Sequence, residues 1–206
     1  MLDLHVSLRS GTRLFITGPI GAGKSTLLRV LFQIYTDPQF VRGHLFPYTH
    51  HGQPIPIHGH PHHILCLAQE TFITHGSLRD QIAYPDLHAH DADIRNALQV
   101  LHLEFLEEAC GGLDSVLSVQ TWKSQLSPGQ IQLLAMARVV LRKPKLVVLD
   151  EATSAMDHDT ANLVFTYLRQ TGCTLITVSH DLDLAHHHHL CLRVADTEAH
   201  LYSIVS

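Results

Sequence analysis

Residues 18–26 carry the residue types and spacing that phosphate chemistry needs. They read Gly-Pro-Ile-Gly-Ala-Gly-Lys-Ser-Thr, and they lie between an apolar run at 14–17 and an apolar periodic segment that starts at Leu27. This spacing is typical of a phosphate-binding loop between a strand and a helix. Glycines let backbone N–H groups turn toward an anion, and the helix start adds its positive dipole end. We therefore expect ATP or GTP to bind here, through Gly18, Pro19, Gly21, Ala22, Gly23, Lys24, Ser25 and Thr26.

A second segment, residues 145–151, is an apolar strand that ends in two carboxylates. Asp150 can hold Mg²⁺ through water, together with the hydroxyl of Ser25. Glu151 can lie beside the γ-phosphate and polarise a water molecule. Lys24 can reach the β- and γ-phosphates. Without the phosphate loop, two solvated acids at a strand end would be the simpler interpretation.

Two more polar side chains follow expected strands. Gln69 comes after the apolar residues 64–67, and His180 comes after those at 173–178. In a parallel α/β sheet, ligands bind at the carboxyl ends of the strands. A lone Gln or His is usually structural. In a chain with a phosphate loop, however, Gln69 can place its amide on Mg²⁺ or on the attacking water, and His180 can reach the same edge.

The remaining segments predict one α/β domain, for which 206 residues are a suitable length. Ser127 is a natural N-cap and Pro128 a natural first helical residue, so a long helix is expected up to about Arg142. A helical lobe is expected over about 72–142. Other helices are expected at 24–35, 91–103, 104–109 and 158–170, and other strands at 2–8, 190–194 and 200–205. The helix at 91–103 has one apolar stripe, formed by Ile94, Ala97, Leu98 and Leu101.

Composition excludes some classes of function. The net charge is -5 with neutral histidines, and no cluster of Lys and Arg stands out, which argues against a nucleic-acid surface. No run approaches the ~18 apolar residues that span a bilayer. The four cysteines are scattered without a C-x-x-C pair, so we expect reduced, buried thiols in a cytosolic compartment.

Nineteen histidines are unusual, and they gather at 44–63 and at 186–189. Neutral imidazoles bind zinc or copper, so a metal site is one hypothesis for each group. The spacings at 44–63 fit no closed tetrahedral pattern, and no cysteine joins them. The simpler interpretation is a polar surface loop over 36–63 and a solvated helix end at 186–189.

Taken together, the motifs resemble the nucleotide-binding domain of ATP-binding-cassette (ABC) transporters over nearly the whole chain. The resemblance implies an α/β P-loop NTPase fold, with an ABC-type ATPase core, a mostly parallel sheet and a helical lobe. It also implies that the domain hydrolyses ATP with Mg²⁺ to power transport. The motifs occur in one order: the phosphate loop, Gln69, Leu-Ser-Pro-Gly-Gln at 126–130, Val-Leu-Asp-Glu at 148–151, Ser-Ala-Met-Asp at 154–157, and His180.

The resemblance further implies that two such domains pair head to tail with ATP between them. Ser127, Gly129 and Gln130 would close the partner's site in trans, and Asp157 would lie at the dimer seam. In cis, catalysis would fall to Glu151, His180 and Gln69, ATP binding to the phosphate loop, and Mg²⁺ binding to Ser25, Gln69 and Asp150.

A finer resemblance, at 16–24, 76–85 and 126–129, is to subfamily D. These half-transporters of peroxisomal and lysosomal membranes move fatty acyl-CoA or cobalamin, and bacterial relatives have a similar pattern. The chain is therefore expected on the cytosolic face of such a membrane. Its transmembrane domain would belong to the same longer chain or to a partner subunit. Ile20 and Leu133 depart from the subfamily, where Ser and Arg are usual.

The family's adenine-stacking aromatic lies upstream of the phosphate loop, and 17 residues precede Gly18 here. The chain is therefore expected to be the C-terminal part of a half-transporter, or a separately encoded subunit. Three alternatives remain. A soluble ABC ATPase of translation or repair usually has two cassettes or a long coiled-coil insertion. A non-hydrolysing nucleotide sensor is the second alternative, and the presence of both Glu151 and His180 argues against it. The last alternative is a histidine-rich metal-binding protein.

Overall fold

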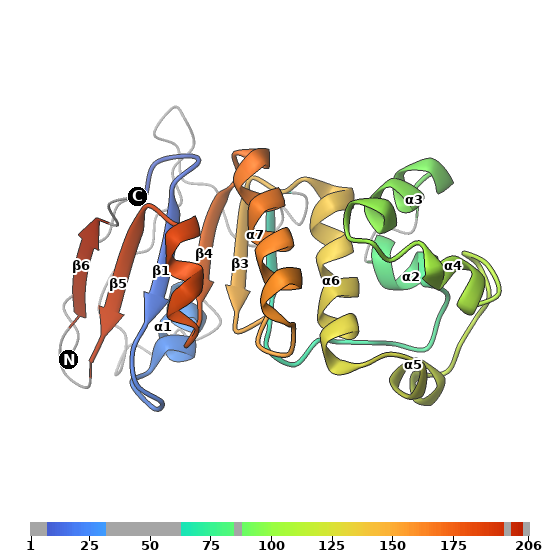
Figure 1. Cartoon of the computed structure of the whole chain (residues 1–206), viewed down its shortest axis with the longest axis horizontal. Helices are drawn as coiled ribbons and strands as arrows, with labels where there is room; N and C mark the ends of the chain where they lie inside the picture. The colour runs from blue at the N-terminus through green and yellow to red at the C-terminus, as the bar shows by residue number, and fades with distance from the viewer. Residues whose placement is uncertain (1–7, 32–62, 85–87, 196–198, 204–206) are drawn as a thin grey trace.

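The computed structural model describes residues 8–31, 63–84, 88–195 and 199–203 (Figure 1). It contains a six-stranded sheet of order β2-β3-β4-β1-β5-β6, in which β1 to β5 are parallel and β6 is antiparallel to β5. The predicted α/β fold with a mostly parallel sheet is confirmed. The strands are β1 Arg13–Thr17, β2 Ile64–Leu67, β3 Leu146–Asp150, β4 Thr174–Val178, β5 Leu190–Val194 and β6 Ala199–Ser203.

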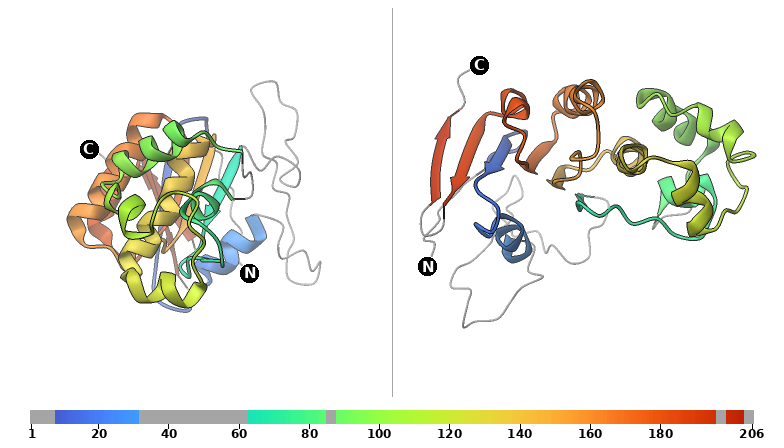
Figure 2. Two further views of the ribbon diagram at one scale, coloured as in Figure 1. Left: turned by 90° about the vertical axis from the view of Figure 1, so that its right-hand side faces the viewer. Right: turned by 60° about the horizontal axis from the view of Figure 1, so that its bottom comes forward.

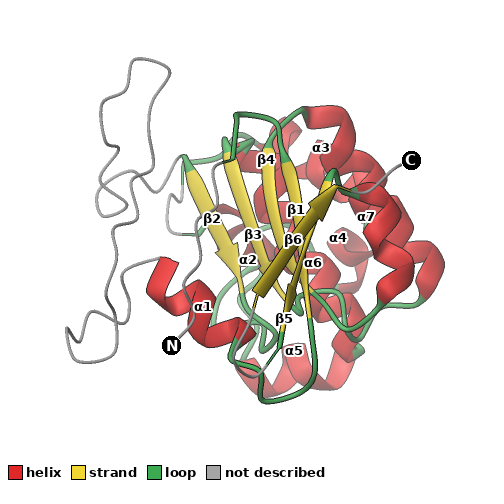
Figure 3. Cartoon of the chain, turned by 90° about the vertical axis from the view of Figure 1, so that its left-hand side faces the viewer, coloured by secondary structure: helices red, strands yellow, loops and turns green. Residues whose placement is uncertain are grey.

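Helices cover both faces of the sheet, as parallel strands require. In β1, Leu14 and Ile16 pack into one apolar layer, and Phe15 packs into the other. The first layer lies under α1 (Lys24–Leu31). The opposite face is covered by α6 (Pro128–Arg142), α7 (His158–Thr171) and the 3₁₀ helix η1 (Leu182–His187) (Figures 2 and 3).

A group of helices lies beyond α6, on the side away from the sheet (Figure 1). The stripe predicted for one of them, α3, is buried. That helix ends at Val100 rather than at the predicted Leu103, because His102 adopts a left-handed φ of 55° and the N–H of Leu103 bonds back to the carbonyl of Leu98. The helices are α2 Leu78–Ala83, α3 Asp91–Val100, α4 Phe105–Ala109 and α5 Val119–Gln125.

Helix α5 was not predicted, because its sequence has no apolar periodicity. It begins after Ser118, whose hydroxyl caps it, and it presents Trp122 to the core. The Trp122 indole is fully buried, and its N–H donates to the carbonyl oxygen of Gly76 at 3.1 Å. One aromatic residue thus fixes α5 against the segment that leads into α2.

Two sequence-based expectations about single residues were wrong. The histidines at 186–189 are not a solvated helix end, because His187 and His188 are 4% and 3% exposed. Phe165 on α7 stacks on the ring of His187. Cys66 is exposed because it lies on the edge strand β2, whereas the other three cysteines are buried.

Some predictions fall on residues that the structure does not describe. They include the strand at 2–8, apart from its last residue, and the histidine-rich segment up to residue 62. Among the described residues, no group of three His, Cys, Asp or Glu side chains is placed to hold a metal ion. In the same part of the chain, no helix combines the length and apolar character needed to cross a bilayer.

The two buried imidazoles are held in the neutral form. His187 Nε2 donates to Oδ1 of Asn162 at 2.8 Å, and its Nδ1 has no partner among the described residues. His188 Nδ1 donates to the carbonyl of Leu184, and its Nε2 accepts from the hydroxyl of Thr177. Burial lowers the pKa of each to about 4, and for His187 the nearby charges of His186 and Arg169 contribute to this shift.

Acid should therefore destabilise the fold before its carboxylates titrate. The unfolded chain binds protons at these histidines below about pH 6.5, whereas the folded chain does so near pH 4. Because the unfolded state binds more protons in this window, the free energy of unfolding should fall as pH drops from 6.5 to 4. Thermal unfolding of His187→Gln should show a shallower pH slope than wild type. The slope should be unchanged in the exposed control His90→Gln, and equal slopes for all three proteins would contradict this account.

Candidate functional site

The candidate site lies where three parallel strands end side by side. Register places Ile16 of β1 beside Val178 of β4, and Val178 beside Asp150 of β3. Gly18, Glu151 and His180 each follow one of these positions by one or two residues. The loop before α1 and the start of α6 lie at this same edge of the molecule (Figure 1).

The phosphate loop leaves β1 through a position that requires glycine. Gly18 has a φ of 149°, and a Cβ there would lie 2.1 Å from the carbonyl oxygen of Val194 on β5. Lys24 is 6% exposed, and its Nζ donates to the carbonyl oxygens of Gly18 and Pro19, both at 2.9 Å. A buried ammonium bound to neutral carbonyls favours an anion nearby, because a buried charge needs a counter-charge.

The hydroxyl of Ser25 forms a hydrogen bond to the last residue of β3. Its Oγ donates to Oδ1 of Asp150 at 3.0 Å. These are hard oxygen donors, one neutral and one anionic, brought together beside the phosphate loop. Such a pair fits Mg²⁺, which prefers carboxylate and hydroxyl oxygens and keeps much of its water shell.

Oε1 of Glu151 and Nε2 of His180 lie 2.8 Å apart, in contact. Their side chains are 18% and 42% exposed, so the pair faces solvent from the site. Glu151 has a left-handed φ of 51°, which is uncommon for a residue with a long side chain. Its N–H donates to the carbonyl of Val178 at 2.9 Å, so the ladder between β3 and β4 holds the backbone in this conformation.

These groups share one cavity of about 280 Å³. Gln69 is not part of its lining, and the Gln69 residue is exposed. The structure therefore brings together the phosphate loop, the strand-end acid and the histidine, and leaves the Gln69 side chain outside. The lining residues are Ile20, Gly21, Gly23, Lys24, Ser25, Thr26, Glu151 and His180.

The residues expected to act in trans lie outside this cavity, at the starts of two helices. Ser127 caps α6: its Oγ accepts from the N–H of Gln130 at 3.2 Å, and Gln130 Oε1 accepts from the N–H of Ser127 at 2.9 Å. Asp157 caps α7, and hydrogen bonds from Thr160 hold the pKa of its carboxyl below the usual value. Both helix starts present exposed polar groups.

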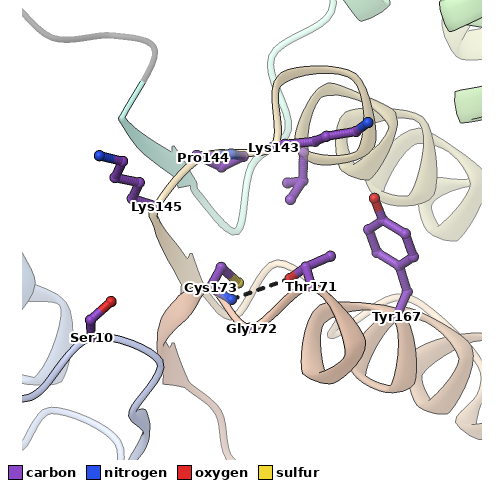
Figure 4. A pocket seen from close by; sticks show the side chains of 9 residues that line it. Ser10, Lys143, Pro144, Lys145, Tyr167, Thr171, Gly172 and Cys173 are labelled. Carbon is purple, nitrogen blue, oxygen red and sulfur yellow. Dashed lines mark hydrogen bonds between the residues drawn. The ribbon is translucent and has the colours of Figure 1, made fainter.

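A larger cavity, of about 460 Å³, lies at the opposite edge of the sheet, where β3 and β4 begin (Figure 4). Lys143 ends α6 and Gly172 ends α7 there, each with left-handed backbone. The positive charges of Lys143 and Lys145 complement the negative ends of the two helix dipoles. None of the predicted site residues lines this cavity. We therefore interpret it as a gap between helix ends, and place the chemistry in the smaller one.

Sequence reasoning missed one polar residue near the site. Gln132 on α6 is 5% exposed, and its amide contacts the loops that follow β2 and β3. A signal was present in the sequence: a glutamine stands one residue before the apolar segment 133–137. Periodicity alone could not say which loops it would meet.

Fold, cavity and motif order together define the nucleotide-binding domain of an ABC protein, and comparison with known proteins agrees. Residues 1–154 match the ABC transporter family, and the chain belongs to that family. It is 36% identical over 206 residues to human ATP-binding cassette sub-family D member 3, covering 93% of this chain and 28% of that protein. It is 36% identical over 199 residues to the human lysosomal cobalamin transporter ABCD4, with 93% and 31% covered.

Solved structures give the same result. A bacterial Atm1-family ABC exporter with ATP bound superposes with a TM-score of 0.76 at 25% identity, covering 94% of this chain and 34% of that one. The chain thus spans about a third or less of the length of these relatives. The expected membership of the ABC family and the similarity to subfamily D are confirmed.

Replacement of Lys24 should weaken nucleotide binding without unfolding the chain. Lys24→Ala removes a buried ammonium whose bonds to charged phosphates would each be worth about 1.5–3 kcal/mol, so the affinity for Mg-ATP should fall by at least about tenfold. The melting temperature should not drop, because the substitution also removes a buried charge. Titration with a fluorescent ATP analogue measures the affinity, and the exposed Lys123→Ala serves as control. Equal affinities for wild type and Lys24→Ala would refute the assignment.

Proposed function

We propose that this domain hydrolyses ATP and so powers the movement of a substrate across a membrane. The observation that supports the proposal most directly is the cavity in which Lys24, Ser25, Glu151 and His180 meet at the carboxyl edge of the sheet. A buried cation, a pair of hard oxygen donors beside it and a carboxylate next to a histidine are parts that suit phosphoryl transfer to water.

In this proposal the loop binds the phosphates of ATP. Its backbone N–H groups and the start of α1 supply fixed positive dipoles, and Lys24 adds a full charge. The Nζ of Lys24 already lies over the loop, bonded to the carbonyls of Gly18 and Pro19, and it exchanges these for phosphate oxygens. Binding therefore needs no large movement of the lysine.

Ser25 and Asp150 would hold Mg²⁺, with Gln69 as the further ligand proposed from the family resemblance. When bound, the ion neutralises charge on the phosphate oxygens as it develops. The contribution of this chain is to hold the hydroxyl and carboxylate oxygens 3.0 Å apart in advance. For Gln69 to take part, its exposed side chain must turn toward the cavity.

Glu151 is proposed to orient the attacking water. One of its oxygens lies 2.8 Å from Nε2 of His180, and the other would accept from water. The water oxygen forms a bond to the γ-phosphorus while the bond to the bridging oxygen breaks, so ADP leaves and inorganic phosphate takes up the hydroxyl. Glu151 takes the water's second proton, and His180 keeps the carboxylate aimed as charge shifts.

The site is proposed to be completed by a second cassette. Within one chain, Ser127, Gly129 and Gln130 lie at the start of α6, outside the cavity. The start of α6 and the phosphate loop nevertheless lie at the same edge (Figure 1). A partner turned head to tail can therefore set its α6 start, with the positive helix dipole, against this chain's ATP. Asp157 would then lie at the seam between the two.

Transport is proposed because relatives carry it in their names, among them a lysosomal cobalamin transporter and a bacterial exporter. A transmembrane domain, in the same longer chain or in a partner subunit, would provide the path. The proposed location is the cytosolic face of a membrane, peroxisomal or lysosomal. The proposed substrate class is fatty acyl-CoA or cobalamin, from the likeness to subfamily D.

Glu151→Gln should separate binding from hydrolysis. The amide keeps the shape of the side chain but cannot take a proton, so turnover should fall by about 10²-fold or more while ATP binding is retained. Phosphate release and nucleotide titration measure the two effects. Glu108→Gln, at an exposed position on α4, should behave as wild type. Wild-type turnover in Glu151→Gln would show that another group orients the water.

Mixing two inactive variants tests the head-to-tail arrangement. Lys24→Ala disables its own phosphate loop, and Ser127→Arg disables the site that it closes on a partner. A mixed dimer keeps one intact site, formed by the loop of the second variant and the α6 start of the first. ATP turnover should therefore appear on mixing, although each variant alone has little. No recovery, despite mixed dimers seen by sedimentation, would exclude sites shared between chains.

A further inference from the structure

Gln132 lies in the second turn of α6, and its side chain joins two loops that are far apart in sequence. The residue is 5% exposed. Its Oε1 accepts from the N–H of Ala155 at 2.9 Å. Its Nε2 donates to the hydroxyl of Ser154 at 3.3 Å and to the carbonyl oxygen of Gln69 at 3.4 Å. The amide therefore uses both its donor and its acceptor face inside the protein.

The loop after β3, which Gln132 contacts at Ser154 and Ala155, lies between two residues of the proposed sites, Glu151 and Asp157. The N–H of Ser154 donates to the carbonyl of Glu151 at 3.1 Å, so the turn that Gln132 holds also contains the proposed water-orienting residue. Asp157 caps α7 two residues after Ala155. A displacement of Ala155 would therefore move Glu151, which precedes it in the loop, and Asp157, which follows it.

Gly129 makes a second contact between α6 and the same peptide. A Cβ at position 129 would lie 2.4 Å from the carbonyl oxygen of Ala155 and 3.5 Å from Cα of Met156. The start of α6 thus rests directly on this loop. Ala155 has its N–H bonded to Gln132 and its carbonyl packed against Gly129, so the loop follows any tilt of the helix.

We propose that Gln132 is a positioning residue that couples the two ATP sites to which one chain contributes. It ties the groups that serve the chain's own site, Gln69 and Glu151, to the groups that it lends to a partner, at the start of α6 and at Asp157. When a partner engages the start of α6, the loop after β3 is set in place, and with it Glu151. This proposal rests on the proposed function, because it concerns the timing of hydrolysis in a head-to-tail pair.

The test compares Gln132→Met, which keeps the volume and removes all three hydrogen bonds, with a matched control. Gln81→Met is that control, because Gln81 is 1% exposed and its amide bonds to Thr74, in the segment that leads into α2. In the full chain, Gln132→Met should lower kcat by about tenfold or more, because the carboxylate is displaced, while KM and nucleotide affinity change little. The dependence of rate on ATP should also lose cooperativity. Gln81→Met should leave kcat and cooperativity as in wild type.

A second variant separates the two loops. Gln132→Glu can still accept from the N–H of Ala155 but sets an oxygen against the carbonyl of Gln69. Hydrogen exchange at residues 154–156 should therefore stay slow in Gln132→Glu and become fast in Gln132→Met. This readout needs no hydrolysis, so it decides the coupling even if wild type proves inactive, a result that would count against the proposed function instead. Wild-type kcat with slow exchange in Gln132→Met, or an equal loss of kcat in Gln81→Met, would overturn the proposal.

Discussion

The parallel register across β1, β4 and β3 is the constraint on which the site depends. Because Ile16, Val178 and Asp150 lie abreast, the next residues of three separate segments leave the sheet at one place. The hydrogen bond from the N–H of Glu151 to the carbonyl of Val178 extends this ladder one residue beyond the strand. A slip of one residue between any two strands would turn side chains to the opposite face and separate the phosphate loop from Glu151.

Helix α6 packs against the sheet and also contacts the group of helices α2 to α5. Its apolar side chains pack into the larger apolar layer, its start carries Ser127, and Arg138 in its later turns donates to the carbonyls of Gln81 and Phe72. Arg79 on α2 adds ion pairs to Asp91 and Asp114. The helical group is therefore held to the sheet mainly through one helix, with polar side chains that bond to backbone carbonyls.

The sequence was sufficient for the order of most strands and helices, because the apolar runs are short, well separated and bounded by capping residues such as Ser127. It missed α5, which has no apolar periodicity. It also identified most of the residues that meet in the cavity, since they follow strand ends, but it placed Gln69 there as well. It could not predict the burial of His187 and His188, because a run of histidines has no apolar periodicity. Their burial depends on contacts with Phe165 and Thr177, which lie in other elements. The sequence likewise could not predict which loops the Gln132 side chain contacts, because the partners of a side chain depend on packing.

The backbone at Glu151 has a consequence for how this position can change over evolutionary time. A left-handed residue with a long side chain costs of the order of 1–2 kcal/mol, and glycine or asparagine would adopt the same conformation with less strain. The backbone alone would thus favour glycine or asparagine at position 151, so the glutamate must be explained by its place in the cavity. If the proposed hydrolysis were lost in a lineage, position 151 should be among the first of the cavity residues to change, whereas Gly18, which the close approach of Val194 requires, should persist.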